Sequence, residues 1–338
     1  MNNIQVDTII LLILSFFTIF IINKFRLKIS KITKLMDYPD NIRKFHSKAV
    51  PLLGGIMIFL SFLLINLYLL FFQNFNKTTL IIFLICSSCF LLGLIDDIKK
   101  ISYKYKFLLL IIIFYLFISL DANLQINKIY ISKFYKEFHL NYLSIPFTVL
   151  CLLLLTNAIN LIDGMDGLCI LISIIFMIWI MNTFHNSEPL YIVLITSLFY
   201  ILYLNVKKNT FLGDSGSLFL GCLIGLNLIF NYNLEISKNH YAVENIFITL
   251  MLPGLDMLRV FVIRIINKKN PFSPDRIHLH HLLIAQGLNK ASILIIITFL
   301  ILLPIFVSIF TNINLIYIIL FYILFYIFLI LKLKKSYS

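Results

Sequence analysis

The segment 157–168, NAINLIDGMDGL, carries amides and carboxylates within a chain that is 61% hydrophobic. Its polar residues recur every three positions: Asn157, Asn160, Asp163 and Asp166. Steps of three drift around an α-helix, so the four side chains cannot share one face. Gly164 and Gly167 predict a helix break, which is tolerated at membrane depth where it lines a watery cavity. A turn built on Asn and Asp explains one or two of these residues, and a functional site explains the set.

The adjacent carboxylates Asp96 and Asp97 end an apolar stretch at 79–95. Neighbouring carboxylates repel each other, so they favour a cation, a basic partner or a shared proton. The alternative is a solvated helix end balanced by Lys99 and Lys100.

The segment 211–221, FLGDSGSLFLG, places Asp214 where an apolar helix begins. Asp214 is either an N-cap or a metal ligand. Free N–H groups at this helix start are expected to bind phosphate, and carboxylate with phosphate oxygens is the ligand set that Mg²⁺ prefers.

Basic side chains cluster in two further segments. In 264–287, Arg276 is followed by three histidines: His278, His280 and His281. No HExxH pattern or Cys accompanies them, so an anion-binding cluster is favoured over zinc. In 37–55, three residues meet either an anionic group or the lipid headgroups: Arg43, Lys44 and His46. Asp256 and Arg259 are expected to pair within the membrane.

The elements that must position these residues are apolar runs. A spanning helix needs about 20 mainly apolar residues. Eleven runs qualify: 7–23, 52–72, 79–95, 107–121, 146–161, 168–183, 188–204, 211–230, 246–266, 292–310 and 313–331. The sequence therefore predicts an all-α polytopic membrane protein of about 11 transmembrane helices, with residues 1–338 as a single integral-membrane catalytic domain and a motif-bearing core at about 37–287.

The distribution of basic residues predicts the orientation. Of 28 Lys and Arg residues, 23 lie in or beside the loops that follow odd-numbered runs or in the C-terminal tail. This positive-inside bias places the N-terminus outside and the C-terminus in the cytoplasm. It also explains the net charge of +13 without nucleic acid. The polar segments share the cytoplasmic face, whereas a transporter gathers polar groups near the midplane. An interfacial enzyme with a metal-assisted anionic substrate is favoured.

Four motifs, in order, resemble the polyprenyl-phosphate N-acetylhexosamine-1-phosphate transferase superfamily, glycosyltransferase family 4: IDD, NAINLIDGMDGL, FLGDSGSLFLG and PFSPDRIHLHH. The form PDRIHLHH is similar to the branch that handles UDP-GlcNAc. The resemblance implies transfer of N-acetylhexosamine 1-phosphate from a UDP-HexNAc to undecaprenyl phosphate, with release of UMP, at a bacterial inner membrane. The product, undecaprenyl-diphosphate-HexNAc, would initiate synthesis of a cell-envelope glycan.

The resemblance also implies roles for the motif residues. Six would be catalytic: Asp96, Asp97, Lys106, His278, His280 and His281. Five would bind substrate: Asn157, Asp163, Asp166, Phe211 and Arg276. Two would hold Mg²⁺, with Mn²⁺ as the alternative ion: Asp214 and Asn160.

In more detail, Asp96 and Asp97 would orient or deprotonate the lipid phosphate, and Lys106 would bind phosphate. Asp166 would hydrogen-bond uracil while Phe211 stacks on it. Arg276 and the three histidines would hold the diphosphate and the N-acetyl sugar.

Several alternatives stay open at this stage. The sequence is one residue longer than the family pattern before Arg43, which leaves the role of that segment open. Phospho-MurNAc-pentapeptide translocase is one alternative activity, and a non-enzymatic transporter of lipid-linked sugars is another. The identity of the HexNAc, the glycan pathway and a homodimeric assembly are not fixed by the sequence.

Overall fold

The computed structural model describes residues 3–39, 49–72, 75–184, 189–239, 241–270 and 277–335. Arg43, Lys44, His46 and Arg276, which the sequence singled out, lie outside the described residues. Within the described part, the helices are α1 (Asn3–Lys24), α2 (Arg26–Thr33), α3 (Gly54–Phe72), α4 (Lys77–Lys99), α5 (Tyr103–Ile118), α6 (Ser144–Ile162), α7 (Leu168–Thr183), α8 (Pro189–Val206), α9 (Gly213–Asn239), α10 (Val243–Ile266), α11 (Leu279–Ala285), α12 (Lys290–Phe310) and α13 (Leu315–Lys335).

Each of the eleven apolar runs coincides with one helix of the described chain. Eight of these helices are long and apolar enough to cross a membrane, while α7 and α8 are apolar but shorter. Helix α5, at 16 residues, begins among charged side chains. A polytopic helical membrane protein is thus confirmed. The number of crossings and the outside position of the N-terminus stay predictions.

Short β-hairpins interrupt the helical pattern in two places. Strands β1 (Met36–Asp37) and β2 (Val50–Pro51) pair antiparallel, as do β3 (Lys128–Ile131) and β4 (Lys136–His139). The second hairpin lies between the apolar runs 107–121 and 146–161. The β-branched and aromatic residues of KIYI are a local signal for strand β3, whereas KEFH has only Phe138 as such a signal.

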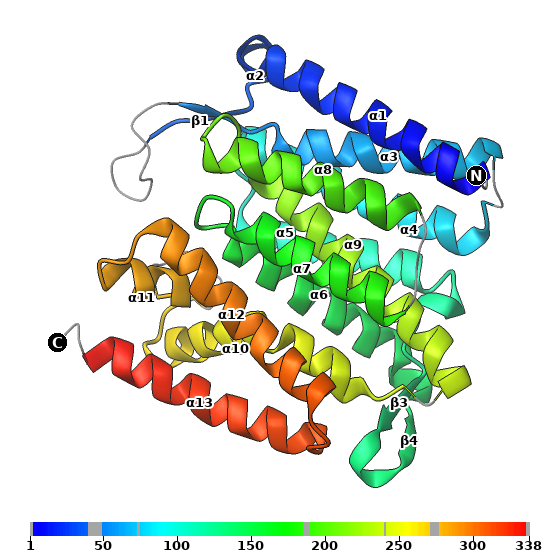
Figure 1. The fold of residues 1–338 in the computed structure, drawn as a ribbon, viewed down its shortest axis with the longest axis vertical. Helices are drawn as coiled ribbons and strands as arrows, with labels where there is room; N and C mark the ends of the chain where they lie inside the picture. The colour runs from blue at the N-terminus through cyan, green and yellow to red at the C-terminus, as the bar shows by residue number, and fades with distance from the viewer. Residues whose placement is uncertain are drawn as a thin grey trace. The chain divides into compact units, whose positions relative to one another are not determined.

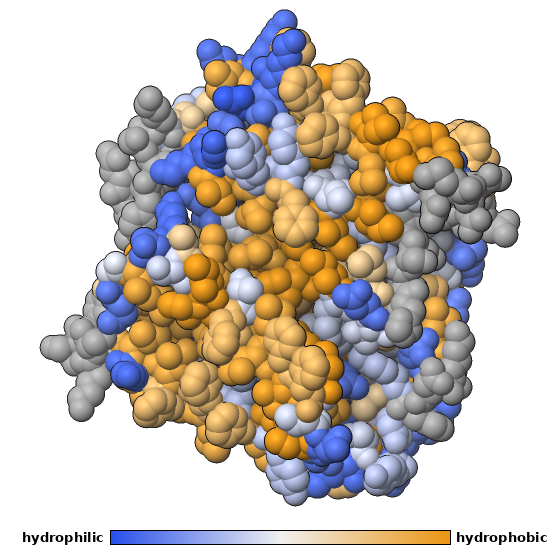
Figure 2. Space-filling view, in the orientation of Figure 1, coloured by the Kyte–Doolittle hydropathy of each residue, from blue (hydrophilic) through white to orange (hydrophobic). Residues whose placement is uncertain are grey.

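Apolar side chains cover much of the surface. Phe17 and Phe71 are 59% and 72% exposed, and Phe321 on α13 is 71% exposed. Figure 2 shows apolar residues over much of the visible face, with hydrophilic residues gathered over α2. Exposing so much apolar surface to water would be unfavourable in free energy, so these faces are suited to contact with lipid.

The chain forms two compact units. Unit 1 comprises residues 1–124 and 148–227, and unit 2 comprises residues 125–147 and 228–338. In unit 1, helices α1, α3 and α8 pack together, and α7 packs on α8 (Figure 1). In unit 2, α10 packs on α12 and α13, and α11 contacts both of those helices (Figure 1). Two compact units can belong to one domain, so the single catalytic domain stays a prediction.

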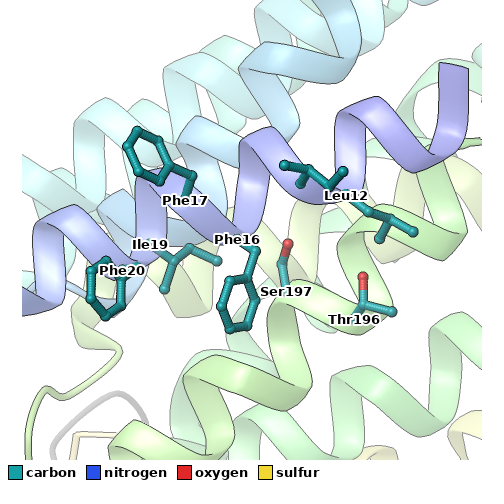
Figure 3. A pocket seen from close by; sticks show the side chains of 8 residues that line it. Leu12, Phe16, Phe17, Ile19, Phe20, Thr196 and Ser197 are labelled. Carbon is teal, nitrogen blue, oxygen red and sulfur yellow. The ribbon is translucent and has the colours of Figure 1, made fainter.

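An open cavity of about 530 Å³ lies between α1 and α8 in unit 1. Phe16, Phe17 and Phe20 line it from α1, and Thr196 and Ser197 line it from α8 (Figure 3). Its lining is apolar apart from two hydroxyl groups. It carries none of the residues that the sequence assigned to chemistry.

Candidate active site

The predicted break in NAINLIDGMDGL is confirmed. Helix α6 ends at Ile162 and α7 begins at Leu168, with Gly167 at a φ of +81°. That φ favours glycine. The side chain of Asn205 fixes the turn, because its Oδ1 accepts a hydrogen bond from the Gly167 N–H at 2.6 Å. Its Nδ2 donates to the Thr210 carbonyl at 3.3 Å, so one residue joins this turn to the segment before α9.

Glycines bring helices α3 and α4 close to the start of α9. The Gly54 N–H donates to the Phe211 carbonyl at 2.9 Å, and the Gly55 N–H donates to that of Leu212 at 3.0 Å. A Cβ at Gly54 would lie 2.8 Å from the Phe211 oxygen. A Cβ at Gly93 on α4 would overlap the backbone of Asp214. The close approach of α3 and α4 to α9 therefore requires glycine.

Asp97 caps helix α9. Its Oδ1 accepts from the Asp214 N–H at 2.9 Å, and its Oδ2 accepts from the Ser215 N–H at 3.0 Å. These are N–H groups left free at a helix start, and a carboxylate there also complements the helix dipole. Because Asp97 accepts from both, these two N–H groups are not available to the phosphate that the sequence led us to expect at this helix start.

Lys106 bridges two carboxylates. Its Nζ lies 2.7 Å from Asp96 Oδ2 and 2.7 Å from Asp214 Oδ2. The N–H of Ile101 also donates to Asp96 Oδ1. Asp96 and Asp97 therefore point to different partners, which relieves the repulsion expected of adjacent carboxylates. Asp214 sits in the first turn of α9 and does not act as its cap.

Asn160 faces Asp214 from helix α6. Its Nδ2 donates to Asp214 Oδ1 at 3.0 Å and to Ser217 Oγ at 2.8 Å. Ser217 in turn donates to the Gly213 carbonyl at 3.1 Å. Asp163 lies after the end of α6, and burial together with the charges of Asp214 and Asp97 raises its pKa well above the usual range.

The remaining residues of unit 1 that were predicted to bind the nucleotide are Asn157, Asp166 and Phe211, and their surroundings differ. Asn157 Nδ2 donates to the Leu153 carbonyl of its own helix at 2.7 Å. Phe211 and Asp166 are both partly exposed, so they are accessible to a ligand. Their roles toward uracil stay predictions.

The carboxylates of unit 1 are suited to a divalent cation. Asp96, Asp97 and Asp214 outnumber the single ammonium group of Lys106, which contacts only Asp96 and Asp214. Asp163 adds a further acid nearby. Carboxylate and amide oxygens, with water or phosphate, are the ligands that Mg²⁺ prefers. Within the described chain, no three His, Cys, Asp or Glu side chains form a ready-made metal site. The donor set fits an ion that takes several of its ligands from substrate and water.

A histidine cluster lies in unit 2. His278 and His280 are buried, and their rings lie nearly parallel with centroids 5.9 Å apart. The ring of His281 lies 4.1 Å from that of His280. Burial and the neighbouring His281 lower the pKa of His280 to about 3.

Asp256 holds this cluster from α10. Its Oδ2 lies 2.8 Å from His278 Nδ1, and its Oδ1 lies 2.7 Å from Arg259 Nη2. The predicted pair of Asp256 and Arg259 is thus confirmed. Tyr326 of α13 completes the contact, donating to Asp256 Oδ1 at 2.8 Å.

Sequence reasoning missed three residues that organise these two clusters: Asn205, Ser217 and Tyr326. Asn205 interrupts an apolar helix near its end, which was a usable signal. Ser217 lies within FLGDSGSLFLG, where the sequence singled out Phe211 and Asp214, and Tyr326 lies in an apolar run with no motif.

Known proteins resemble this chain over most of its length. The family profile described as glycosyl transferase family 4 matches residues 79–231, which hold the unit 1 cluster. A probable undecaprenyl-phosphate N-acetylglucosaminyl 1-phosphate transferase of Bacillus subtilis (strain 168) is 30% identical over 302 residues, covering 86% of this chain and 82% of that protein. The chain belongs to glycosyl transferase family 4.

Other similar proteins carry the names of both transferase activities that the sequence left open. An undecaprenyl-phosphate alpha-N-acetylglucosaminyl 1-phosphate transferase of Thermotoga maritima is 30% identical over 85% of this chain and 84% of that protein. A phospho-N-acetylmuramoyl-pentapeptide-transferase of Nautilia profundicola is 32% identical over 63% of this chain and 69% of that protein. The resemblance stated from the four motifs is confirmed at the level of the family.

Proposed function

We propose that this member of glycosyl transferase family 4 transfers N-acetylglucosamine 1-phosphate from UDP-GlcNAc to undecaprenyl phosphate. An oxygen of the lipid phosphate attacks the sugar-bearing phosphorus, the bond to the UMP oxygen breaks, and UMP leaves. The names of the B. subtilis and T. maritima relatives, which match over more than four fifths of this chain, carry the choice of substrates. The bacterial inner membrane is the proposed location.

The unit 1 cluster supports phosphoryl transfer. Both substrates are anions, so their reaction depends on positioning and charge neutralisation more than on covalent chemistry. Lys106 supplies an ammonium group that is held between Asp96 and Asp214, and it can turn its three N–H donors toward phosphate oxygens. Asp97 keeps the start of α9 in place, which positions Asp214.

A divalent ion, Mg²⁺ or Mn²⁺, is part of the proposal. Asp214, with Asn160 beside it, would hold the ion. When bound, it would neutralise diphosphate charge during transfer. The proposed roles of Asp163, Asp166 and Phe211 in nucleotide binding, and of the histidines in diphosphate and sugar binding, follow from the family resemblance.

UMP release tests the proposed function. Purified protein in detergent would receive undecaprenyl phosphate with UDP-GlcNAc, UDP-GalNAc, a 6-deoxy UDP-HexNAc or UDP-MurNAc-pentapeptide, each with Mg²⁺ and with EDTA. We expect release from UDP-GlcNAc that needs the ion. Release from UDP-MurNAc-pentapeptide alone would favour the activity named for the N. profundicola relative. No release from any nucleotide by folded protein would contradict an enzymatic function and favour a transporter.

A substitution pair refines this test. Asp214→Asn should abolish UMP release, because it removes the carboxylate that is proposed to hold the ion. Ser88→Ala is a matched control: Ser88 is partly exposed on α4, and its hydroxyl donates to the carbonyl of Leu84 in its own helix. Equal loss in both variants would point to damage by purification.

A further inference from the structure

The carboxylate of Asp256 gathers donors from three helices and the loop before α11. Its Oδ1 accepts from Arg259 Nη2 at 2.7 Å, from the Tyr326 hydroxyl at 2.8 Å and from the Leu279 N–H at 3.0 Å. Its Oδ2 lies 2.8 Å from His278 Nδ1. All these residues belong to unit 2. The Oδ1 atom of Asp256 thus accepts three hydrogen bonds, and its Oδ2 atom faces the imidazole of His278.

This arrangement decides which ring nitrogen of His278 carries hydrogen. An ionised carboxylate only accepts hydrogen bonds, so His278 Nδ1 must donate to it. The guanidinium of Arg259 already balances the charge of Asp256, so the pair does not require an imidazolium. A neutral ring with hydrogen on Nδ1 leaves a lone pair on Nε2.

The Nε2 atom is placed for a ligand. It is buried and has no hydrogen-bond partner among the described residues, and the same holds for Nε2 of the adjacent His280. Buried polar atoms are normally satisfied, so an unsatisfied one indicates a missing partner. A lone pair needs a donor, and a diphosphate ionised at neutral pH offers acceptors instead.

We propose that Asp256, supported by Arg259 and Tyr326, is a positioning residue that fixes His278 with hydrogen on Nδ1, so that Nε2 accepts a hydrogen bond from a hydroxyl or amide N–H group of the nucleotide-sugar. This assignment rests on the proposed function. It separates His278 from the diphosphate contact that the family resemblance implies for the histidines as a group. It also gives helix α13 a part in supporting the histidine cluster of unit 2.

Helix α13 also contacts the segment just after α11. Gln286 Nε2, just after α11, donates to the Leu333 carbonyl of α13 at 3.1 Å. The Arg259 Nε also donates to the Tyr326 hydroxyl at 2.9 Å. The helix that carries Tyr326 is therefore held against both the helix of Asp256 and the segment of the histidines.

Asp256→Asn tests the tautomer directly. The carbonyl of Asn should stay with the three donors now on Oδ1, and its NH₂ group should face His278 Nδ1. His278 would then accept on Nδ1 and carry its hydrogen on Nε2. Nuclear magnetic resonance of ¹⁵N-histidine-labelled full-length protein distinguishes the two forms, and the His278→Gln variant assigns the signal. We expect hydrogen on Nδ1 in the wild type and on Nε2 in the variant.

Kinetics tests the role of the tautomer. In Asp256→Asn, a buried N–H would face a donor group of the substrate, and kcat/KM for UDP-GlcNAc should fall by about 10²-fold or more. Tyr326→Phe removes one donor to Asp256 and leaves the tautomer unchanged. Its kcat/KM should fall by less than about fivefold, because one neutral hydrogen bond of the support is lost.

Distinct results would overturn the proposal. Wild-type His278 with hydrogen on both nitrogens, or on Nε2 alone, would contradict the tautomer, even if Asp256→Asn failed to fold. A reversed tautomer with kcat/KM within twofold of wild type would contradict the contact with substrate. A wild type that shows the expected tautomer but releases no UMP from any nucleotide would overturn the proposed function instead.

Discussion

Asp97→Asn separates a structural role of this carboxylate from a chemical one. The side chain is 7% exposed and accepts one backbone N–H on each oxygen, from Asp214 and Ser215. Asn keeps one acceptor and places an NH₂ group against the other N–H. A hydrogen bond to a charged group contributes about 1.5–3 kcal/mol, and the favourable interaction with the helix dipole is also lost. We expect a destabilisation of about 2–4 kcal/mol.

The assay is thermal unfolding of the detergent-solubilised protein without substrate or Mg²⁺, followed by size-exclusion chromatography after heating. At about 2 °C per kcal/mol for a chain of this size, the apparent Tm should fall by about 4–8 °C. Asp96→Asn is the matched control. Its Oδ1 can still accept from Ile101, and Lys106 keeps its contact with Asp214, so its apparent Tm should fall by less than half as much.

The same measurement can refute this reasoning. If Asp97→Asn unfolds within about 1 °C of the wild type and yet fails to release UMP, Asp97 does not stabilise α9 as a cap. A direct role toward the lipid phosphate, as the family resemblance implies, would then be favoured. Loss of stability in Asp96→Asn alone would also contradict the assignment of the cap to Asp97.

Three further predictions concern stability and charge. Lys106→Met should lower the apparent Tm and make it rise more steeply with millimolar Mg²⁺ than in the wild type, because the ion would replace the ammonium group between two carboxylates; equal Mg²⁺ responses would contradict this. Gly93→Ala should destabilise by about 1–3 kcal/mol because its Cβ would overlap the backbone of Asp214, whereas Gly254→Ala, with nothing within 4 Å, should be neutral or stabilising by thermal unfolding. The pKa of His280 is about 3 in the folded protein against 6.5 ordinarily, so the unfolded chain binds more protons between these values. The contribution of His280 to the free energy of unfolding should be fully present above pH 6.5 and should decline as the pH falls toward 3. The unfolding temperature of His280→Gln should therefore fall less steeply with decreasing pH than that of the wild type.

The sequence by itself determined the helices and several local features. Runs of about 20 apolar residues fix the positions of the eleven helices, because a membrane-spanning segment must satisfy its backbone hydrogen bonds internally. The break between α6 and α7 follows from Gly164 and Gly167, which stand among the four regularly spaced polar residues of NAINLIDGMDGL. The pairing of Asp256 with Arg259 is local as well, since residues three apart are neighbours on a helix.

Only the tertiary structure decided how the carboxylates are used. Asp97 is 117 residues from the Asp214 N–H that it accepts, and Tyr326 is 70 residues from Asp256. A sequence reveals that such side chains are polar, but the partner of each depends on how a helix is rotated and where it crosses its neighbours. The sequence led us to expect phosphate-binding N–H groups at the start of α9, but those of Asp214 and Ser215 already donate to Asp97 of the neighbouring helix α4.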